Sequence, residues 1–121
     1  MPSISPEPER AWADIDLGAL RANARTVAAV SGARLLPMVK ANGYGVGAIQ
    51  VARALDALDP WGFGVATVEE GAELRAAGIS RPILVFQPLH PALIPRYLGH
   101  ALRPTIGDIE SLMAWLGQGP E

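Results

Sequence analysis

The sequence predicts an α/β fold built around a parallel sheet, and three features support this. Short apolar segments that suit buried strands begin near residues 35, 61, 82 and 101. Each is followed by a segment whose apolar residues recur at helical spacing, as in strand–helix–strand units. Local end signals agree, because Thr67 and Glu70 form a T-x-x-E capping box and Gly78 follows the same helix. These features together predict about four βα units with right-handed connections.

The N-terminal segments are justified by their composition. Residues 1–9 are rich in proline and lack an apolar stretch, so they are predicted to be a disordered leader and not a signal peptide. Residues 10–16 are predicted to be extended, and Asp14 or Asp16 can cap the helix that follows. That helix is expected over residues 17–30, where apolar side chains recur at intervals of three and four, and Gly32 follows its end.

The remaining elements alternate regularly to the C-terminus. Four such βα units could be half of an eight-stranded barrel, which usually takes about 250 residues, or most of a small doubly wound sheet. The chain ends directly after its last helix, which predicts an incomplete domain that exposes apolar surface. The expected elements are a strand at 35–39, a helix at 48–58, a strand at 61–66, a helix at 68–77, a strand at 82–86, a proline-broken helical turn at 91–99, a strand at 101–106 and a helix at 109–117.

Composition excludes several classes of protein. The chain has 121 residues, a formal net charge of −2 and scattered arginines, which argues against nucleic acid or an anionic membrane as a partner. It has no cysteine, so a disulfide framework and a thiolate metal site are excluded, and a reducing cytoplasm is compatible. No apolar run approaches the ~20 residues of a membrane helix. The histidines and most of the acids are expected at the surface, and no metal site is predicted.

Lys40 is the only lysine beside nine arginines, and it follows the first predicted strand. Parallel α/β folds build ligand sites at the carboxyl ends of their strands. A lysine that forms a Schiff base needs a partly neutral amine, which burial favours, and arginine cannot replace it because its guanidinium stays protonated. This pattern favours a covalent role for Lys40. The alternative is a surface cation retained by chance.

The glycines after Lys40 allow a competing hypothesis. Gly43, Gly45 and Ala48 match G-x-G-x-x-A between a strand and a helix, the pattern of a dinucleotide-binding turn. However, Lys40 and Asn42 intervene before the first glycine, and no acidic residue ends the second strand. The dinucleotide hypothesis is therefore weak, although the turn could still hold a single phosphate.

Three stretches of the sequence carry a family resemblance: RAWADIDLGALRANAR, PMVKANGYGVGA and GFGVATVEEGAELRAAGISRPILVF. In this order and spacing they resemble the N-terminal blocks of alanine racemase, a pyridoxal-phosphate enzyme with an eight-stranded barrel and a β-rich domain. The resemblance runs from about residue 10 to the C-terminus. It implies that residues 10–121 are the N-terminal portion of a (β/α)8 TIM-type barrel, and that the C-terminal half-barrel and the β-rich domain are absent.

The resemblance also implies roles for single residues. Lys40 would carry pyridoxal 5'-phosphate as a Schiff base and act as the base on one face of the α-carbon. Tyr44 matches the family tyrosine that reaches the cofactor phosphate, and Phe86 matches an apolar position that lines the cofactor. Read without the resemblance, Tyr44 is a turn aromatic and Phe86 a core residue. The family commonly has histidine where this chain has Val46 and alanine where it has Gly43, which leaves the substrate open.

Racemisation needs proton transfer on both faces of the α-carbon, so one lysine is not enough. In the family the opposite base is a tyrosine from the partner subunit, in a region that this chain does not contain. The favoured hypothesis is therefore the N-terminal part of a cytoplasmic, homodimeric alanine racemase that makes D-alanine for the cell wall, and the 121 residues alone are expected to be inactive. The alternatives are a stand-alone remnant that binds the cofactor without racemising and, last, a dinucleotide-binding module.

Overall fold

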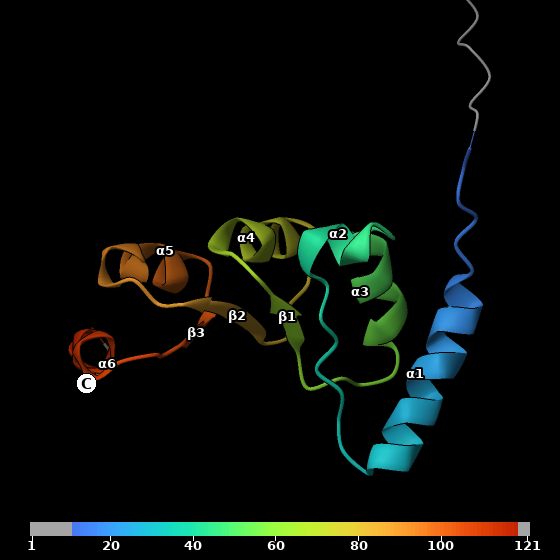
Figure 1. Cartoon of the computed structure of the whole chain (residues 1–121), viewed down its shortest axis with the longest axis horizontal. Coiled ribbons are helices and arrows are strands. Elements are labelled where there is room, and N and C mark those ends of the chain that lie inside the picture. Colours follow the sequence, from blue (N-terminus) through green and yellow to red (C-terminus); the bar gives the residue numbers. More distant parts are fainter. Residues whose placement is uncertain (1–10, 119–121) are drawn as a thin grey trace, which may run out of the picture.

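The computed structural model describes residues 11–118, so the predicted leader at 1–9 lies outside the described residues. Helices and strands alternate along most of this length, as the sequence predicts (Figure 1). Every predicted helix is present, and most end within two residues of the expected position. The elements are α1 Leu17–Ser31, α2 Lys40–Tyr44, α3 Ala48–Asp56, β1 Phe63–Val65, α4 Val68–Ala76, β2 Ile83–Pro88, the 3-10 helix η1 Pro91–Leu93, α5 Ile94–Gly99, β3 Arg103–Thr105 and α6 Ile109–Leu116.

The strands form an open parallel sheet in the order β1-β2-β3. The segment before β1 joins this edge through a single parallel bridge between Met38 and Gly64, with the Val39 N–H donating to the Gly64 carbonyl at 2.8 Å. Neighbours in the sheet are thus neighbours in sequence, whereas a doubly wound sheet reverses its strand order. The arrangement is one arc of a barrel wall and not a closed barrel.

The predicted strand at 35–39 is only partly confirmed, because the segment runs beside β1 without forming a regular strand. The Gly64 N–H donates to the Pro37 carbonyl at 2.8 Å, and the Trp61 N–H donates to the Leu35 carbonyl at 2.8 Å. Pro37 has no N–H to donate, so the ladder is interrupted there. The segment is extended and lies at the edge of the sheet, which is enough to place Lys40 at its carboxyl end.

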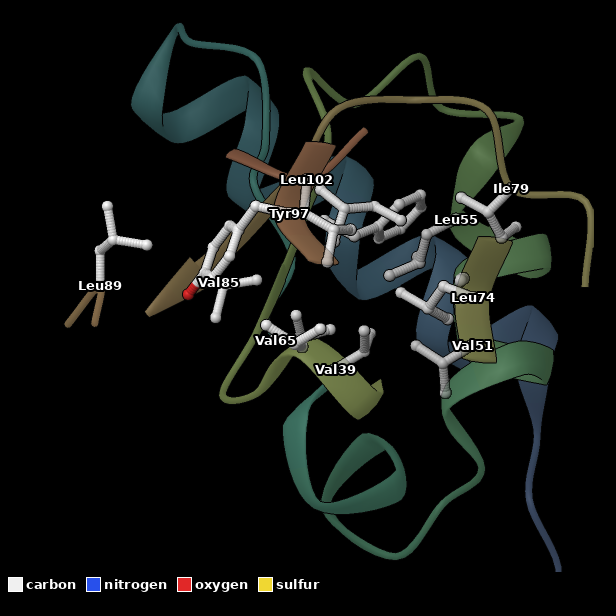
Figure 2. Close-up of a cluster of buried hydrophobic side chains, with 14 of the residues drawn as sticks. Val39, Val51, Leu55, Val65, Leu74, Ile79, Val85, Leu89, Tyr97 and Leu102 are labelled. Atoms are coloured by element: carbon white, nitrogen blue, oxygen red, sulfur yellow. The ribbon is translucent and has the colours of Figure 1, made fainter. Parts of the chain in front are cut away.

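One face of the sheet packs against helices and forms the core. Figure 1 shows α4 and α5 along one side of the strands, with α3 between β1 and α1. Figure 2 shows the buried side chains between these layers, with Val39, Val65 and Val85 from neighbouring extended segments facing Tyr97 and Leu102. Phe63 and Ile83 are fully buried on the same face. This core fixes the sheet edge from which the candidate site projects.

Helix ends follow the predicted signals. The Asp16 carboxylate accepts the Ala19 N–H at 2.9 Å, so Asp16 and not Asp14 caps α1, and Gly32 ends it at φ 67°. Thr67 and Glu70 form both halves of the capping box of α4. Gly78, at φ 89°, follows α4 as predicted. These caps satisfy backbone groups that a helix end would otherwise leave unpaired.

Arg75 joins the end of α4 to the neighbouring loops. Its guanidinium donates to four backbone carbonyls at 2.7–2.9 Å, which belong to Ile79, Arg81, His100 and Ala101. No carboxylate takes part in this cluster of the described structure, so the charge is compensated by carbonyl dipoles alone. Arg75 therefore fixes the loop before β3 relative to α4.

Apolar side chains remain exposed at the end of the arc. On α6, Ile109, Met113 and Leu116 are each more than 60% exposed, and on α1 no residue is buried. Helix α6 lies beyond β3 at the edge of the structure (Figure 1). The prediction that this chain exposes apolar surface is confirmed for these described helices. Within residues 11–118, no helix combines the length and apolar character needed to cross a membrane.

Candidate functional site

Lys40 begins the turn that follows the extended segment at the sheet edge. The preceding residue, Val39, is buried in the core and is bonded to β1, so the backbone that carries Lys40 is held by the sheet. The Lys40 side chain itself is exposed, which differs from the expectation that burial would surround it. Its amine lies at the carboxyl end of the strands, where parallel α/β folds place their ligand sites.

The turn after Lys40, which makes up most of the short element α2, is left-handed. Ala41, Asn42, Gly43 and Tyr44 all have φ between 50° and 64°, and Gly45 follows at φ 86°. A left-handed conformation costs about 1–2 kcal/mol for each residue with a Cβ, although Asn tolerates it better than Ala or Tyr. The sequence does not predict this conformation, because only the glycines favour it. Such strain persists only where the surrounding contacts fix the backbone.

The left-handed turn brings the two predicted site residues together. Lys40 Nζ lies 5.9 Å from the centroid of the Tyr44 ring, within the range of a cation–π contact. Tyr44 is 63% exposed, so its hydroxyl is accessible beside the lysine amine. Among the described residues, no carboxylate lies within ion-pair distance of Nζ. The site therefore offers a primary amine next to a tyrosine ring.

Apolar side chains lie on the sheet face opposite the core, next to this edge. A Cβ built on Gly64 would overlap the Met38 thioether and would stand 2.9 Å from Cε2 of Phe86. Met38 and Phe86 therefore approach each other over Gly64, and Phe86 is 44% exposed there. Phe86 is thus not a core residue in the described structure. Phe86 lies on the same face as Met38, on β2, and β1 lies between β2 and the segment that leads to Lys40.

The glycine-rich turn bonds the N–H groups of its three glycines internally. Gly43 N–H donates to the Val39 carbonyl at 2.9 Å, and Gly45 N–H donates to the Ala41 carbonyl at 3.0 Å. Gly47 N–H donates to the Asn42 carbonyl at 2.8 Å, and the Asn42 side chain accepts the Ala48 N–H at 3.0 Å. A dinucleotide-binding turn must present such groups to pyrophosphate. The three glycine N–H groups are therefore not presented to a ligand, which further weakens the dinucleotide hypothesis.

Glu70 is the residue that the sequence analysis missed at this site. Its carboxylate accepts the Ala41 N–H at 2.7 Å and the Ala66 N–H at 2.6 Å, in addition to the Thr67 N–H of the capping box. The capping motif identified the last of these bonds. Nothing local could identify the first, because Ala41 and Glu70 are 29 residues apart.

Other polar residues of the described structure serve structural roles. His90 caps η1 by accepting the Ala92 N–H at 3.1 Å, and Glu69 pairs with Arg96 at 2.8 Å. Asp59 pairs with both Arg34 and Arg81, and the hydrogen bond from Arg81 is the main cause that lowers the Asp59 pKa. None of these residues contacts Lys40, so the site consists of Lys40, Tyr44 and the backbone that Glu70 holds.

Comparisons of the sequence with known proteins point to one family. Residues 15–120 match the family described as alanine racemase, N-terminal domain. The alanine racemase of Symbiobacterium thermophilum is 48% identical over 100 residues, which is 82% of this chain and 26% of that protein. The chain therefore spans about a quarter of the length of this relative.

Solved structures show the same arrangement of elements. The alanine racemase of E. faecalis superposes with a TM-score of 0.78 at 37% identity, covering 86% of this chain and 29% of that one. A histidine racemase from Leuconostoc mesenteroides superposes with a TM-score of 0.76 at 22% identity, covering 84% of this chain and 28% of that one, and shows a shared fold alone. The predicted part of a TIM-type barrel is thus confirmed, and the chain belongs to the alanine racemase N-terminal domain family.

Proposed function

We propose that this chain is the part of an alanine racemase that binds pyridoxal 5'-phosphate through Lys40, and that the complete protein interconverts L- and D-alanine. The observation that carries the proposal is the exposed amine of Lys40 at the carboxyl end of the sheet, with Nζ 5.9 Å from the Tyr44 ring centroid. Family membership supplies the reaction class, since similar proteins at 48% and 37% identity are named alanine racemase.

The residues present fit this cofactor by their chemistry. The Lys40 amine has no carboxylate partner among residues 11–118, so it would be free to hold the aldehyde of the cofactor covalently. The accessible Tyr44 hydroxyl is a suitable donor to a phosphate oxygen. Met38 and Phe86 supply an apolar surface on the adjacent sheet face.

Each residue would have one task in the reaction. When bound, the cofactor supplies a conjugated ring that accepts the electron pair left at a deprotonated α-carbon. After the substrate amine has taken its place on the cofactor, the Lys40 amine would take the α-proton on one face or return one there. Tyr44 orients the cofactor by its hydroxyl, and the left-handed turn keeps Tyr44 beside Lys40.

The second proton must come from elsewhere in the complete protein. The chain contains two tyrosines, and Tyr97 is only 1% exposed within the core, so it cannot reach a ligand beside Lys40. We therefore assign the opposite base to residues beyond those described or to a partner subunit, in line with the homodimer that the family resemblance implies. Supply of D-alanine to the cell wall and a cytoplasmic location belong to the same proposal.

The proposal that alanine is the substrate rests on sequence identity to known proteins and not on the fold. A histidine racemase shares this fold at 22% identity, so the barrel arc alone does not select the amino acid. The 48% identity to an alanine racemase favours alanine. Val46 is half-buried beside the turn, where the family commonly has histidine, and it is the position at which substrate preference could depart from the family.

The test is reductive trapping with pyridoxal phosphate and borohydride, followed by peptide mass spectrometry. Because the chain has a single lysine, a pyridoxyl group can attach only at Lys40 or at the N-terminal amine. We expect an adduct on the Lys40 peptide of the wild type and none in Lys40→Arg. Folded wild-type protein without this adduct would overturn the proposal. An adduct without D-alanine formation by the complete protein would support the alternative of a cofactor-binding remnant.

A further inference from the structure

The Glu70 carboxylate connects the backbones at the ends of two neighbouring extended segments. One oxygen accepts the Ala41 N–H at 2.7 Å, directly after Lys40. The other accepts the Ala66 N–H at 2.6 Å and the Thr67 N–H at 3.2 Å, directly after β1. A capping box requires only the bond to the Thr67 N–H. The two remaining bonds therefore have a purpose beyond ending a helix.

The bond to Ala41 reaches the point where the left-handed turn begins. Ala41 is the first of the consecutive residues with positive φ, and it has no side chain that could fix its own conformation. The Gly43, Gly45 and Gly47 N–H groups all bond within the turn or to Val39. Ala41 N–H instead bonds to the side chain of another βα unit. Glu70 thus joins the start of the strained turn to β1.

A charged acceptor suits this position. Hydrogen bonds to an ionised carboxylate are shorter and about twice as strong as neutral ones, and the distances of 2.6 and 2.7 Å to Ala66 and Ala41 agree. Each of the two oxygens is needed, because the two N–H groups approach different oxygens. An amide at residue 70 would present one acceptor and one NH₂ group, and the NH₂ group would face an N–H donor.

We propose that Glu70 is a positioning residue: it fixes the backbone of Ala41 and so the direction from which Lys40 reaches the cofactor. This inference rests on the proposed function of Lys40. Loss of the carboxylate frees the start of the left-handed turn, which relaxes toward a less strained conformation and moves Lys40 and Tyr44 apart. Glu70 itself neither contacts the cofactor nor transfers a proton.

Two control variants separate this role from simpler ones. Thr67→Ala removes the other half of the capping box, in which Thr67 Oγ1 accepts the Glu70 N–H at 3.2 Å, and leaves the bond to Ala41 intact. Glu69→Gln makes the same change of charge on the adjacent residue, whose carboxylate is bonded to Arg96. A helix-cap effect alone would appear equally in Thr67→Ala, and a charge effect alone would appear in Glu69→Gln.

The experiment compares the wild type, Glu70→Gln and both controls by amide hydrogen exchange and by pyridoxal phosphate titration, with the visible absorbance of the lysine-bound cofactor as the signal. We expect Glu70→Gln to speed exchange at Ala41 and to weaken cofactor binding, each by about tenfold or more, as for loss of a charge-assisted hydrogen bond. Both controls should match the wild type in these measurements. A thermal melt identifies any variant that has unfolded. If Glu70→Gln has unfolded, it is replaced by Glu70→Asp, whose side chain is too short to reach Ala41.

The outcomes distinguish this inference from the function on which it rests. Unchanged exchange at Ala41 and unchanged cofactor affinity in folded Glu70→Gln would overturn the positioning role. Equal losses in Thr67→Ala would also overturn it, because they would reduce Glu70 to a helix cap. Absence of the cofactor signal in the wild type would instead contradict the role of Lys40, while the exchange measurement would still report whether Glu70 holds the turn.

Discussion

The Met38 thioether occupies the space over the Cα of Gly64, where any side chain on residue 64 would have to stand. The same two residues form the parallel bridge that joins the segment before Lys40 to β1. Gly64→Ala is therefore expected to lower the free energy of unfolding by about 1–3 kcal/mol, as overpacking does elsewhere. Urea denaturation measures this change. Met38→Ala should reduce the cost of Gly64→Ala, because it removes the nearer of the two side chains that would collide and leaves only Phe86 close to the new Cβ.

Gly99 provides the control for this prediction. A Cβ built there meets no atom within 4 Å, so Gly99→Ala should change the free energy of unfolding little. Residues in contact give non-additive effects, whereas distant ones add. Strict additivity of Gly64→Ala and Met38→Ala would show that these two side chains do not share the space assigned to them.

Tyr44→Phe is expected to weaken pyridoxal phosphate binding by about tenfold, the usual effect of losing one hydrogen bond to a charged group. The ring remains beside Lys40, so the lysine should still be trapped by borohydride at saturating cofactor. Because Tyr44 is 63% exposed, the melting temperature without cofactor should not change. Equal cofactor affinities of the wild type and Tyr44→Phe would exclude a role for the hydroxyl.

Arg75→Lys is expected to lower the free energy of unfolding by about 2–4 kcal/mol, measured by urea denaturation. A lysine ammonium cannot reproduce the planar guanidinium that donates to four carbonyls. Three of these bonds are partly buried, and a buried carbonyl left unpaired costs about 1–3 kcal/mol. Arg53→Lys is the matched control, since Arg53 donates to the Ala77 carbonyl alone. A similar loss in both variants would contradict the role given to Arg75.

The stability of the fold should fall at alkaline pH because of Tyr97. Burial is the main cause that raises the pKa of Tyr97 above 10.0, and the charge of Glu69 adds to it. In the unfolded chain Tyr97 ionises near pH 10, while the folded state keeps it neutral, so its contribution is present below pH 10 and is lost as the pH rises further. Tyr97→Phe should therefore show a weaker decline in melting temperature above pH 10. Parallel declines in both proteins would contradict this.

Local signals in the sequence predicted most of the fold. Asp16, Gly32 and the Thr67–Glu70 box each act within a few residues, so their effects can be read from the sequence alone. The strand at 35–39 was overestimated because its apolar composition suits a strand, while Pro37 interrupts the hydrogen-bond ladder. The alternation of strands and helices in the sequence is the same for a barrel and a doubly wound sheet. The order of the paired strands in the structure distinguishes the two.

The candidate site was predicted less completely. The position of Lys40 after an apolar strand and the family resemblance identified the lysine and Tyr44, which the structure brings together. The left-handed turn could not be predicted, because Ala41 and Tyr44 have no preference for positive φ. The bond from Ala41 to Glu70 depends on the folded sheet and has no local signature. The contacts that fix the site are thus tertiary, while the residues proposed to perform its chemistry are recognisable in the sequence.

The sequential order of the strands has a consequence for biosynthesis. Each strand pairs with the strand of the unit that precedes it, while the core that α3, α4 and β1 share also includes Ile83, Tyr97 and Leu102 from later in the chain. On the ribosome, each strand can therefore pair with the one before it as it emerges, but the core is completed only when the chain has emerged as far as Leu102. Because Glu70 arrives one unit after Lys40, the lysine turn becomes fixed only when the second unit is complete. Translation itself thus sets the order in which the scaffold and then the lysine turn are assembled.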